Sequence, residues 1–378
     1  FGRHGIFPAG ASSESDSRRS AAIIWNDTSG NDVYLRYRDI QGQWRAPMAL
    51  ASSMEDGTRE LRISMNEGGE SLGIWDGWSE EGIEVAAHVS GAEEWNTALV
   101  ISRADNANGS LTDQPTIALN NAGQAAAAWV WHESLQGASQ LVSRTRDAAG
   151  VWSEHMVHYD GAGKAGFPEV ALNDAGDLWL VWQELHNDLF VIRGRFRNGA
   201  TQTWGDVETY SEGEVSAGFG QPALLENGDG LVIWRQSNLA GGQWPAIAHI
   251  AGRTRRADGE LGATVQISNP GEDSFHTMKE GRKTNVIYDE TLGAAVTWSG
   301  FDGENYRIYV ATMDNAGVWS DPVPLSVEGQ HAKLPSIVNA NGRWAVSWQR
   351  SDGLTSRIQA SAFRPSDQTW STPVSLSA

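Results

Sequence analysis

The residues of this sequence that are best placed to do chemistry follow a tryptophan that recurs seven times. Each of these tryptophans closes a short apolar stretch, and successive copies are 50 to 64 residues apart. The tryptophans themselves are interpreted as packing residues, because every repeat has one. The residues after each copy differ, and variable residues on a repeated scaffold are how binding surfaces are built. The seven are Trp25, Trp75, Trp129, Trp182, Trp234, Trp298 and Trp348.

Several variable residues have the types that β-elimination of a polysaccharide requires. The reaction needs a group that neutralises a uronate carboxylate, a base for the proton on C5 and an acid for the leaving oxygen. Arg, His and Tyr can supply these roles. The catalytic candidates are His132, His276, His331, Arg235 and Tyr210.

A second set of residues is suited to holding a ligand. Flat rings suit sugar faces or other planar groups, and gathered cations suit an anion. Carboxylates at Asp76 and Glu184 also leave glycoside hydrolysis open, which needs two carboxylates about 5 to 9.5 Å apart. With 47 acidic residues in the chain, such pairs also arise by chance. The ligand-binding candidates are Asp76, Trp78, Trp131, Glu184, Phe301, Arg350, Lys279 and Arg282.

No metal site and no cofactor is predicted. The chain has no Cys, which excludes disulfides, thiolate metal sites and cysteine nucleophiles. His155 and His158 are three residues apart, a spacing that places them on opposite faces of a strand. The sequence holds no compact motif for zinc, a nucleotide phosphate or haem.

The net charge of the chain limits the classes of partner that it is expected to bind. There are 28 basic and 47 acidic side chains, a net charge of −19. Such a field repels nucleic acid and anionic membranes. No apolar run reaches the roughly 18 to 20 residues of a membrane-spanning helix. The expected partner is a carbohydrate or a protein, and the oligomeric state is left open.

The elements that position these residues are predicted to be strands. With 42 Gly and 18 Trp among 378 residues, the composition is typical of an all-β chain with many turns. Asn-x-x-Gly sequences between apolar runs indicate tight hairpins, and alternating segments such as 33–37 and 307–311 indicate half-buried strands. Four-stranded units of about 50 residues, repeated seven times, predict a seven-bladed β-propeller of four-stranded antiparallel blades.

No linker divides the sequence, so residues 1–378 are interpreted as a single propeller domain. In this fold the loop after the second strand and the loop between blades open on one face, where the candidate residues are expected to gather. The approximate blade limits are 5–53, 54–104, 112–160, 165–211, 218–270, 275–328 and 331–378.

A second tryptophan closes six of the seven units, and in three of them, residues 42–44, 150–152 and 317–319, it stands in a Gly-x-Trp sequence. The whole pattern resembles secreted bacterial β-propellers, a group that includes sialidase-like repeats, propeller lectins and seven-bladed polysaccharide lyases. Asp147 and Asp314 keep the Asp-to-Trp spacing of a sialidase Asp box, with the glycine one residue later. The resemblance implies the propeller fold, and it assigns no catalytic residue.

Two functions follow as hypotheses. The first is an exported recognition protein that binds a carbohydrate or a protein partner through its variable loop face. The second is a polysaccharide lyase on uronate-containing glycans, with His, Tyr and Arg on the same face. A secreted or periplasmic location is expected from the acidic composition, the absence of Cys and a sequence that begins at Phe1 without Met.

Overall fold

The computed structural model consists of strands and turns, and its described residues contain no helix. None of them therefore belongs to a helix of the length and apolarity that crossing a membrane takes. The described residues are 11–15, 21–26, 32–39, 41–51, 58–77, 82–88, 95–96, 99–102, 111–132, 138–161, 164–212, 215–237, 248–269, 273–275, 285–339 and 342–377.

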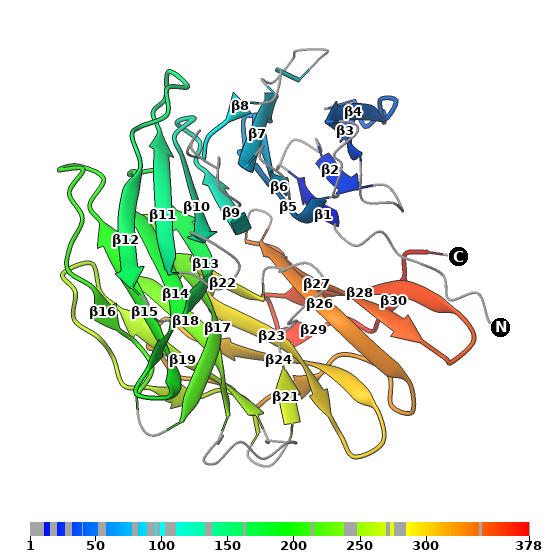
Figure 1. Ribbon diagram of the computed structural model, residues 1–378. Helices are drawn as coiled ribbons and strands as arrows, with labels where there is room; N and C mark the ends of the chain where they lie inside the picture. The colour runs from blue at the N-terminus through cyan, green and yellow to red at the C-terminus, as the bar shows by residue number, and fades with distance from the viewer. Residues whose placement is uncertain are drawn as a thin grey trace. The chain divides into compact units, whose positions relative to one another are not determined.

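The strands form seven antiparallel sheets, each built from strands that are consecutive in the sequence (Figure 1). Five sheets have four strands, and the other two have a fifth, which is β22 beside β23 or β30 beside β28. The chain divides into two compact units, residues 1–185 with 195–206 and residues 186–194 with 207–378. The all-β class and the four-stranded units are confirmed. A single domain and a ring of seven blades stay predictions.

Unit 1 contains the first three sheets, each in the order of the sequence. They are β1 Ala11–Ser15, β2 Ala21–Asn26, β3 Val33–Arg38 and β4 Met48–Ala51; β5 Thr58–Met65, β6 Ser71–Gly77, β7 Gly82–His88 and β8 Leu99–Val100; and β9 Leu111–Leu119, β10 Ala125–His132, β11 Ser139–Arg146 and β12 Met156–Gly161.

The fourth sheet has strands from both units, and unit 2 contains the last three sheets. The fourth is β13 Ala165–Leu172, β14 Leu178–His186, β15 Leu189–Arg197 and β16 Glu208–Thr209. The fifth is β17 Ser216–Leu224, β18 Gly230–Ser237, β19 Ala248–Arg255 and β20 Val265–Gln266. The sixth is β21 Asp273–Phe275, β22 Val286–Asp289, β23 Gly293–Phe301, β24 Tyr306–Met313 and β25 Val323–Pro324. The seventh is β26 His331–Asn339, β27 Trp344–Ser351, β28 Ser356–Arg364, β29 Thr369–Trp370 and β30 Val374–Ser375.

The recurring tryptophan lies on one inner strand of every sheet, namely β2, β6, β10, β14, β18, β23 or β27. Six of the seven indoles are at most 1% exposed, and Trp25 is half-buried. Trp129, for example, packs in unit 1 among apolar side chains of β9, β10 and β11 and of the preceding sheet. A large ring buried in this way contributes strongly to the core. The interpretation of these tryptophans as packing residues is confirmed.

The Asn-x-x-Gly sequences form the predicted hairpin turns, and the same asparagines join neighbouring sheets of unit 1. Asn66, Asn120 and Asn173 each accept a hydrogen bond from the residue four positions later, which closes the turn. The side-chain amide of Asn66 donates to the backbone oxygen of Asn120 at 3.1 Å, and that of Asn120 donates to Asn173 at 2.9 Å. Buried amides therefore link three successive sheets at one edge.

His158 on β12 is a buried histidine that stays neutral in the folded protein. Its Nε2 lies 2.7 Å from Oγ of Ser143, and its ring meets the Trp204 indole edge-on at 4.5 Å. Burial lowers the pKa of His158 to about 3, and the positive charge of Arg195 lowers it further. The contacts of His158 are those of a packing residue.

Acid is expected to destabilise the fold through His158. The unfolded chain takes up a proton on this imidazole near pH 6.5, whereas the folded chain does so only near pH 3. The stability that the neutral ring provides is therefore complete above pH 6.5 and is lost as the pH falls towards 3, at up to roughly 1.4 kcal/mol per pH unit. Urea unfolding of the unaltered protein and His158→Gln across this range measures it. The two stability curves should converge on acidification, and parallel curves would contradict the assignment.

Candidate functional site

Each sheet brings variable residues together at one edge. The end of the tryptophan-bearing strand pairs with the starts of both neighbouring strands, so His132 lies opposite Leu111 and Ser139. In the seventh sheet Arg350 lies opposite Ala332 by the same pairing. We call this the loop edge of a sheet. Most of the candidate residues that the structure describes lie on or near loop edges, as their positions after the tryptophan predicted.

A β-bulge interrupts the first strand of several sheets close to the loop edge. In β26 the register shifts between Lys333 and Ser336, and equivalent shifts occur in β13 and β17. The bulge contains a non-glycine residue with a left-handed backbone, which costs on the order of 1–3 kcal/mol. A bulge changes the alternation of side chains, so it re-aims the residues beside it. The left-handed residues are Gln114, Phe167, Phe219 and Leu334, with φ between 53° and 60°.

Three side chains of unit 2 lie around the ring of Tyr306, and we call these four residues the Tyr306 cluster. The Lys333 ammonium lies 4.5 Å from the centre of the Tyr306 ring, within the range of a cation–π interaction. The Phe301 ring lies 5.2 Å from it and the His331 ring 6.3 Å. Phe301 ends β23, Tyr306 begins β24, and His331 begins β26. Residues of two successive sheets thus form one aromatic and cationic surface.

The ring nitrogens of His331 have different roles. Nδ1 accepts a hydrogen bond from the backbone N–H of Tyr306 at 3.2 Å. In the neutral ring the proton then resides on Nε2, which is a donor. His331 is therefore suited to donate a hydrogen bond to a ligand oxygen. Proton abstraction by Nδ1 would require the loss of the bond to Tyr306.

Lys333 adds an uncompensated positive charge to the Tyr306 cluster. Its side chain is exposed, and no described carboxylate lies within ion-pair distance of its ammonium. The charge of Lys333 gives this surface an affinity for anionic groups.

Arg350 does not join the Tyr306 cluster, although it comes from the neighbouring strand. It pairs with buried Ala332, so its side chain leaves the sheet on the face opposite to that of His331 and Lys333. Its Nε donates to Oε1 of Gln330 at 2.6 Å, and its Nη1 lies 3.5 Å from Oδ2 of Asp352.

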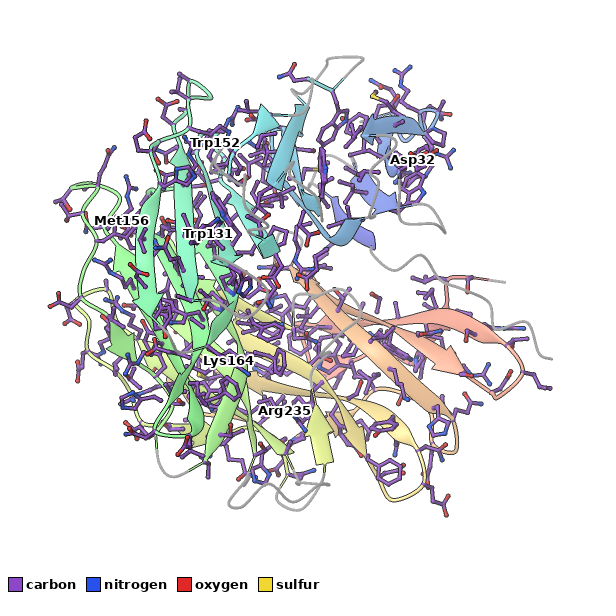
Figure 2. The ribbon with its side chains drawn as sticks, in the orientation of Figure 1. Asp32, Trp131, Trp152, Met156, Lys164 and Arg235 are labelled. Atoms are coloured by element: carbon purple, nitrogen blue, oxygen red, sulfur yellow. The ribbon has the colours of Figure 1, made fainter. Side chains whose placement is uncertain are left out.

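Arg235 lies at the loop edge of the fifth sheet, opposite Gly218 and Ile250 (labelled in Figure 2). Its side chain is half-buried. A ligand-binding or catalytic role for Arg235, as for Arg350, stays a prediction.

In unit 1, His132 forms a pair with Asp113. Nε2 of His132 lies 3.4 Å from Oδ1 of Asp113, and both side chains are between a quarter and a third exposed. The carboxylate favours a proton on Nε2, which leaves the lone pair of Nδ1 available. Trp131, next in the strand, points to the other face and packs against the unit 1 core (Figure 2).

Two candidate carboxylates are buried and hydrogen-bonded within the protein. Asp76 is 2% exposed, and its Oδ1 accepts the backbone N–H of Glu60 at 2.8 Å. Glu184 is 6% exposed, and its Oε2 accepts the indole N–H of Trp182 at 3.2 Å. Buried polar groups are normally bonded in this way to offset the loss of water. Contact of either carboxylate with a ligand stays a prediction that requires local rearrangement.

Tyr210 is fully buried and follows β16. Its hydroxyl donates to Oε2 of Glu208 at 2.8 Å, and the same carboxylate forms an ion pair with Arg255 at 2.8 Å. The hydroxyl thus belongs to a structural network, and a role as catalytic acid stays a prediction. The candidates Trp78, His276, Lys279 and Arg282 lie outside the residues whose side chains the structure describes.

The candidates of the sequence analysis did not include Tyr306, Asp113 or Lys333. All three lie near a loop edge on a strand other than the tryptophan-bearing one, so their distance from a tryptophan gave no indication. Tyr306 had a usable signal, because Phe301 and Tyr306 flank an Asp-Gly turn and face each other across the hairpin. Within the described part of the chain, no three His, Asp or Glu side chains gather as a metal site would require.

Comparison with known proteins gives the fold and no family. No protein-family model and no curated protein matches the chain. The polysaccharide lyase Uly1 is similar in structure with a TM-score of 0.58 and 13% identity, over 90% of this chain and 87% of that chain. An ulvan lyase of polysaccharide lyase family PL25, bound to a saccharide of glucuronic acid and sulfated rhamnose, has a TM-score of 0.59 and 10% identity, over 90% and 89%.

An α-L-arabinanase from Penicillium chrysogenum, in complex with arabinobiose, has a TM-score of 0.51 and 12% identity, over 82% of this chain and 94% of that chain. At such identities a likeness establishes the fold alone. The chain therefore has the β-propeller fold of this group of carbohydrate-active proteins, as the sequence pattern predicted, and matches no single family.

Proposed function

We propose that this protein binds a carbohydrate and that a sugar residue of the ligand lies on the Tyr306 cluster. The observation that carries the proposal is the Lys333 ammonium 4.5 Å above the Tyr306 ring, beside Phe301 and His331. Aromatic faces suit the apolar C–H face of a sugar, while Nε2–H of His331 and the Lys333 ammonium donate to its oxygens.

The ligand proposed is an acidic carbohydrate. Lys333 has no acidic partner in the described structure, so its charge is available to a carboxylate or sulfate group. The similar structures of polysaccharide-degrading proteins support a carbohydrate ligand at the level of the fold. A protein partner is the alternative for the same surface.

Binding is expected to depend on Tyr306 and Lys333. Tyr306→Ala removes the ring at the centre of the cluster and Lys333→Ala removes the unpaired charge, so each should weaken binding of uronate-containing oligosaccharides by about tenfold or more. Calorimetric titration measures the change. Arg364→Ala, which removes an exposed cation at the far end of β28, is the control and should bind normally. Unchanged affinity in both variants would show that the ligand binds at another site.

A second candidate function is a polysaccharide lyase, and the His132–Asp113 pair favours it. With Nε2–H directed at Asp113, Nδ1 of His132 can accept the C5 proton of a uronate residue. The C4–O bond then breaks as the C4–C5 double bond forms, and the leaving oxygen takes a proton from an acid or from water.

Lyase activity is measured as a rise in absorbance at 235 nm during incubation with uronate-containing polysaccharides. If the pair is catalytic, His132→Ala should lower the rate by about 10²- to 10⁴-fold, the usual contribution of a general base. Asp113→Asn should lower it less, because the imidazole remains. A flat trace with the unaltered protein across the substrate panel excludes the lyase for those substrates and leaves the binding proposal untouched.

The seven sheets support the finer proposal of one seven-bladed ring. A single ring of 378 residues has an expected radius of gyration of about 21 Å, which small-angle scattering measures. Two separated units would give a clearly larger value. A ligand that is a polymeric acidic glycan also favours a secreted or periplasmic location, which fractionation of cells that express the protein would test.

A further inference from the structure

Unit 1 contains a cavity of about 230 Å³ at the end of β10 remote from His132. Its size is below the roughly 300–1,000 Å³ of most small-molecule sites, so it suits one small group. Trp152 forms part of its wall and lies away from Trp131 in Figure 2. About half of the lining residues are polar. Those that matter are Gln124, Arg146, Asp147, Trp152, Arg197 and Gln202.

Arg146 and Arg197 are equivalent residues of successive sheets. Each lies at the end of the third strand, and each bridges to the tryptophan of the following Gly-x-Trp or related segment, Trp152 or Trp204. Arg146 has a counter-ion, because its Nη1 lies 2.9 Å from Oε1 of Glu70. The Arg197 guanidinium has no hydrogen bond or ion pair among the residues that the structure describes.

The difference comes from one residue of the hairpin turn. Glu70 follows Asn66 by four residues and donates its backbone N–H to that asparagine. Gln124 has the same place and the same bond to Asn120 in the next sheet. The repeat therefore has an amide on the cavity wall where the preceding repeat has the carboxylate that pairs with arginine.

The electrostatics of Arg197 agree with its lack of a counter-ion. Burial lowers the pKa of Arg197, and no acidic group opposes that effect. For Arg255 burial acts in the same direction, but hydrogen bonds and charge from Glu208 outweigh it and raise the pKa.

Asp147 is the one carboxylate among the lining residues. Its Oδ1 accepts the backbone N–H groups of Ala149 and Val151 in a turn. Glu70 offsets the charge of Arg146, so Arg197 is the lining cation whose charge is available to a ligand.

We propose that this cavity binds a small anion, the carboxylate or sulfate group of a charged sugar, with Arg197 as the principal contact. A planar guanidinium can form paired hydrogen bonds to either group. The amide of Gln124 is a second donor, since its Oε1 already accepts from Asn120. Trp152 provides an apolar wall for the sugar ring. The site is separate from the Tyr306 cluster and does not depend on the proposed function.

The test is calorimetric titration of the purified protein with sodium sulfate, sodium glucuronate and glucose. Either anion should bind in the millimolar range and glucose should not; binding of sulfate or of glucuronate alone identifies the preferred group. Gln124→Glu restores the carboxylate of the neighbouring repeat, so it should lower the affinity at least tenfold while the protein stays folded. Arg197→Gln should do the same.

Arg364→Ala, which removes an exposed cation outside both proposed sites, is the control and should bind the anions as the unaltered protein does. A difference between this control and Gln124→Glu reports on the cavity, because neither residue belongs to the Tyr306 cluster. The inference is overturned if neither anion binds the unaltered protein, or if Gln124→Glu binds the anions as tightly as before.

Discussion

An indole on an inner strand of each sheet packs into the core, and the other features of the repeats follow from that packing. Six of the seven recurring tryptophans are almost completely buried, and they pack with apolar side chains from neighbouring strands. Such a ring tolerates little change in its surroundings. The residue types at the strand centres are therefore similar in every repeat, and the sequence varies at the edges, where side chains meet solvent.

The two edges of the sheets differ in structure. At one edge, buried asparagines of the hairpin turns donate to the next turn. At the loop edge, bulges that contain left-handed residues interrupt the first strand of several sheets. The first edge is regular, so a single exchange such as Gln124 for Glu leaves an arginine unpaired. The second edge is irregular, and it gathers Tyr306, His331 and Lys333.

Both proposed sites are built around a cation whose charge no described carboxylate offsets. Arg146 and Arg255 have glutamate counter-ions, whereas Lys333 and Arg197 have none among the described residues. A paired cation serves the fold, because its charge is offset within the protein. An unpaired cation can bind the anionic group of an acidic sugar, and an adjacent aromatic ring can bind the apolar face of the sugar ring.

The strands, the hairpin turns, the packing role of the tryptophans and the edge on which variable residues lie could all be predicted from the sequence. These features are local, since alternation and turn chemistry involve residues close in the chain. Which of those residues meet depends on how the strands pair and pack. The tertiary structure joined Tyr306 to Lys333 across two sheets and turned Arg350 to the opposite face from His331. It also buried Tyr210 with Glu208 and left Arg197 beside an amide. Such contacts depend on bulges, on strand register and on partners distant in the sequence, which periodicity does not specify.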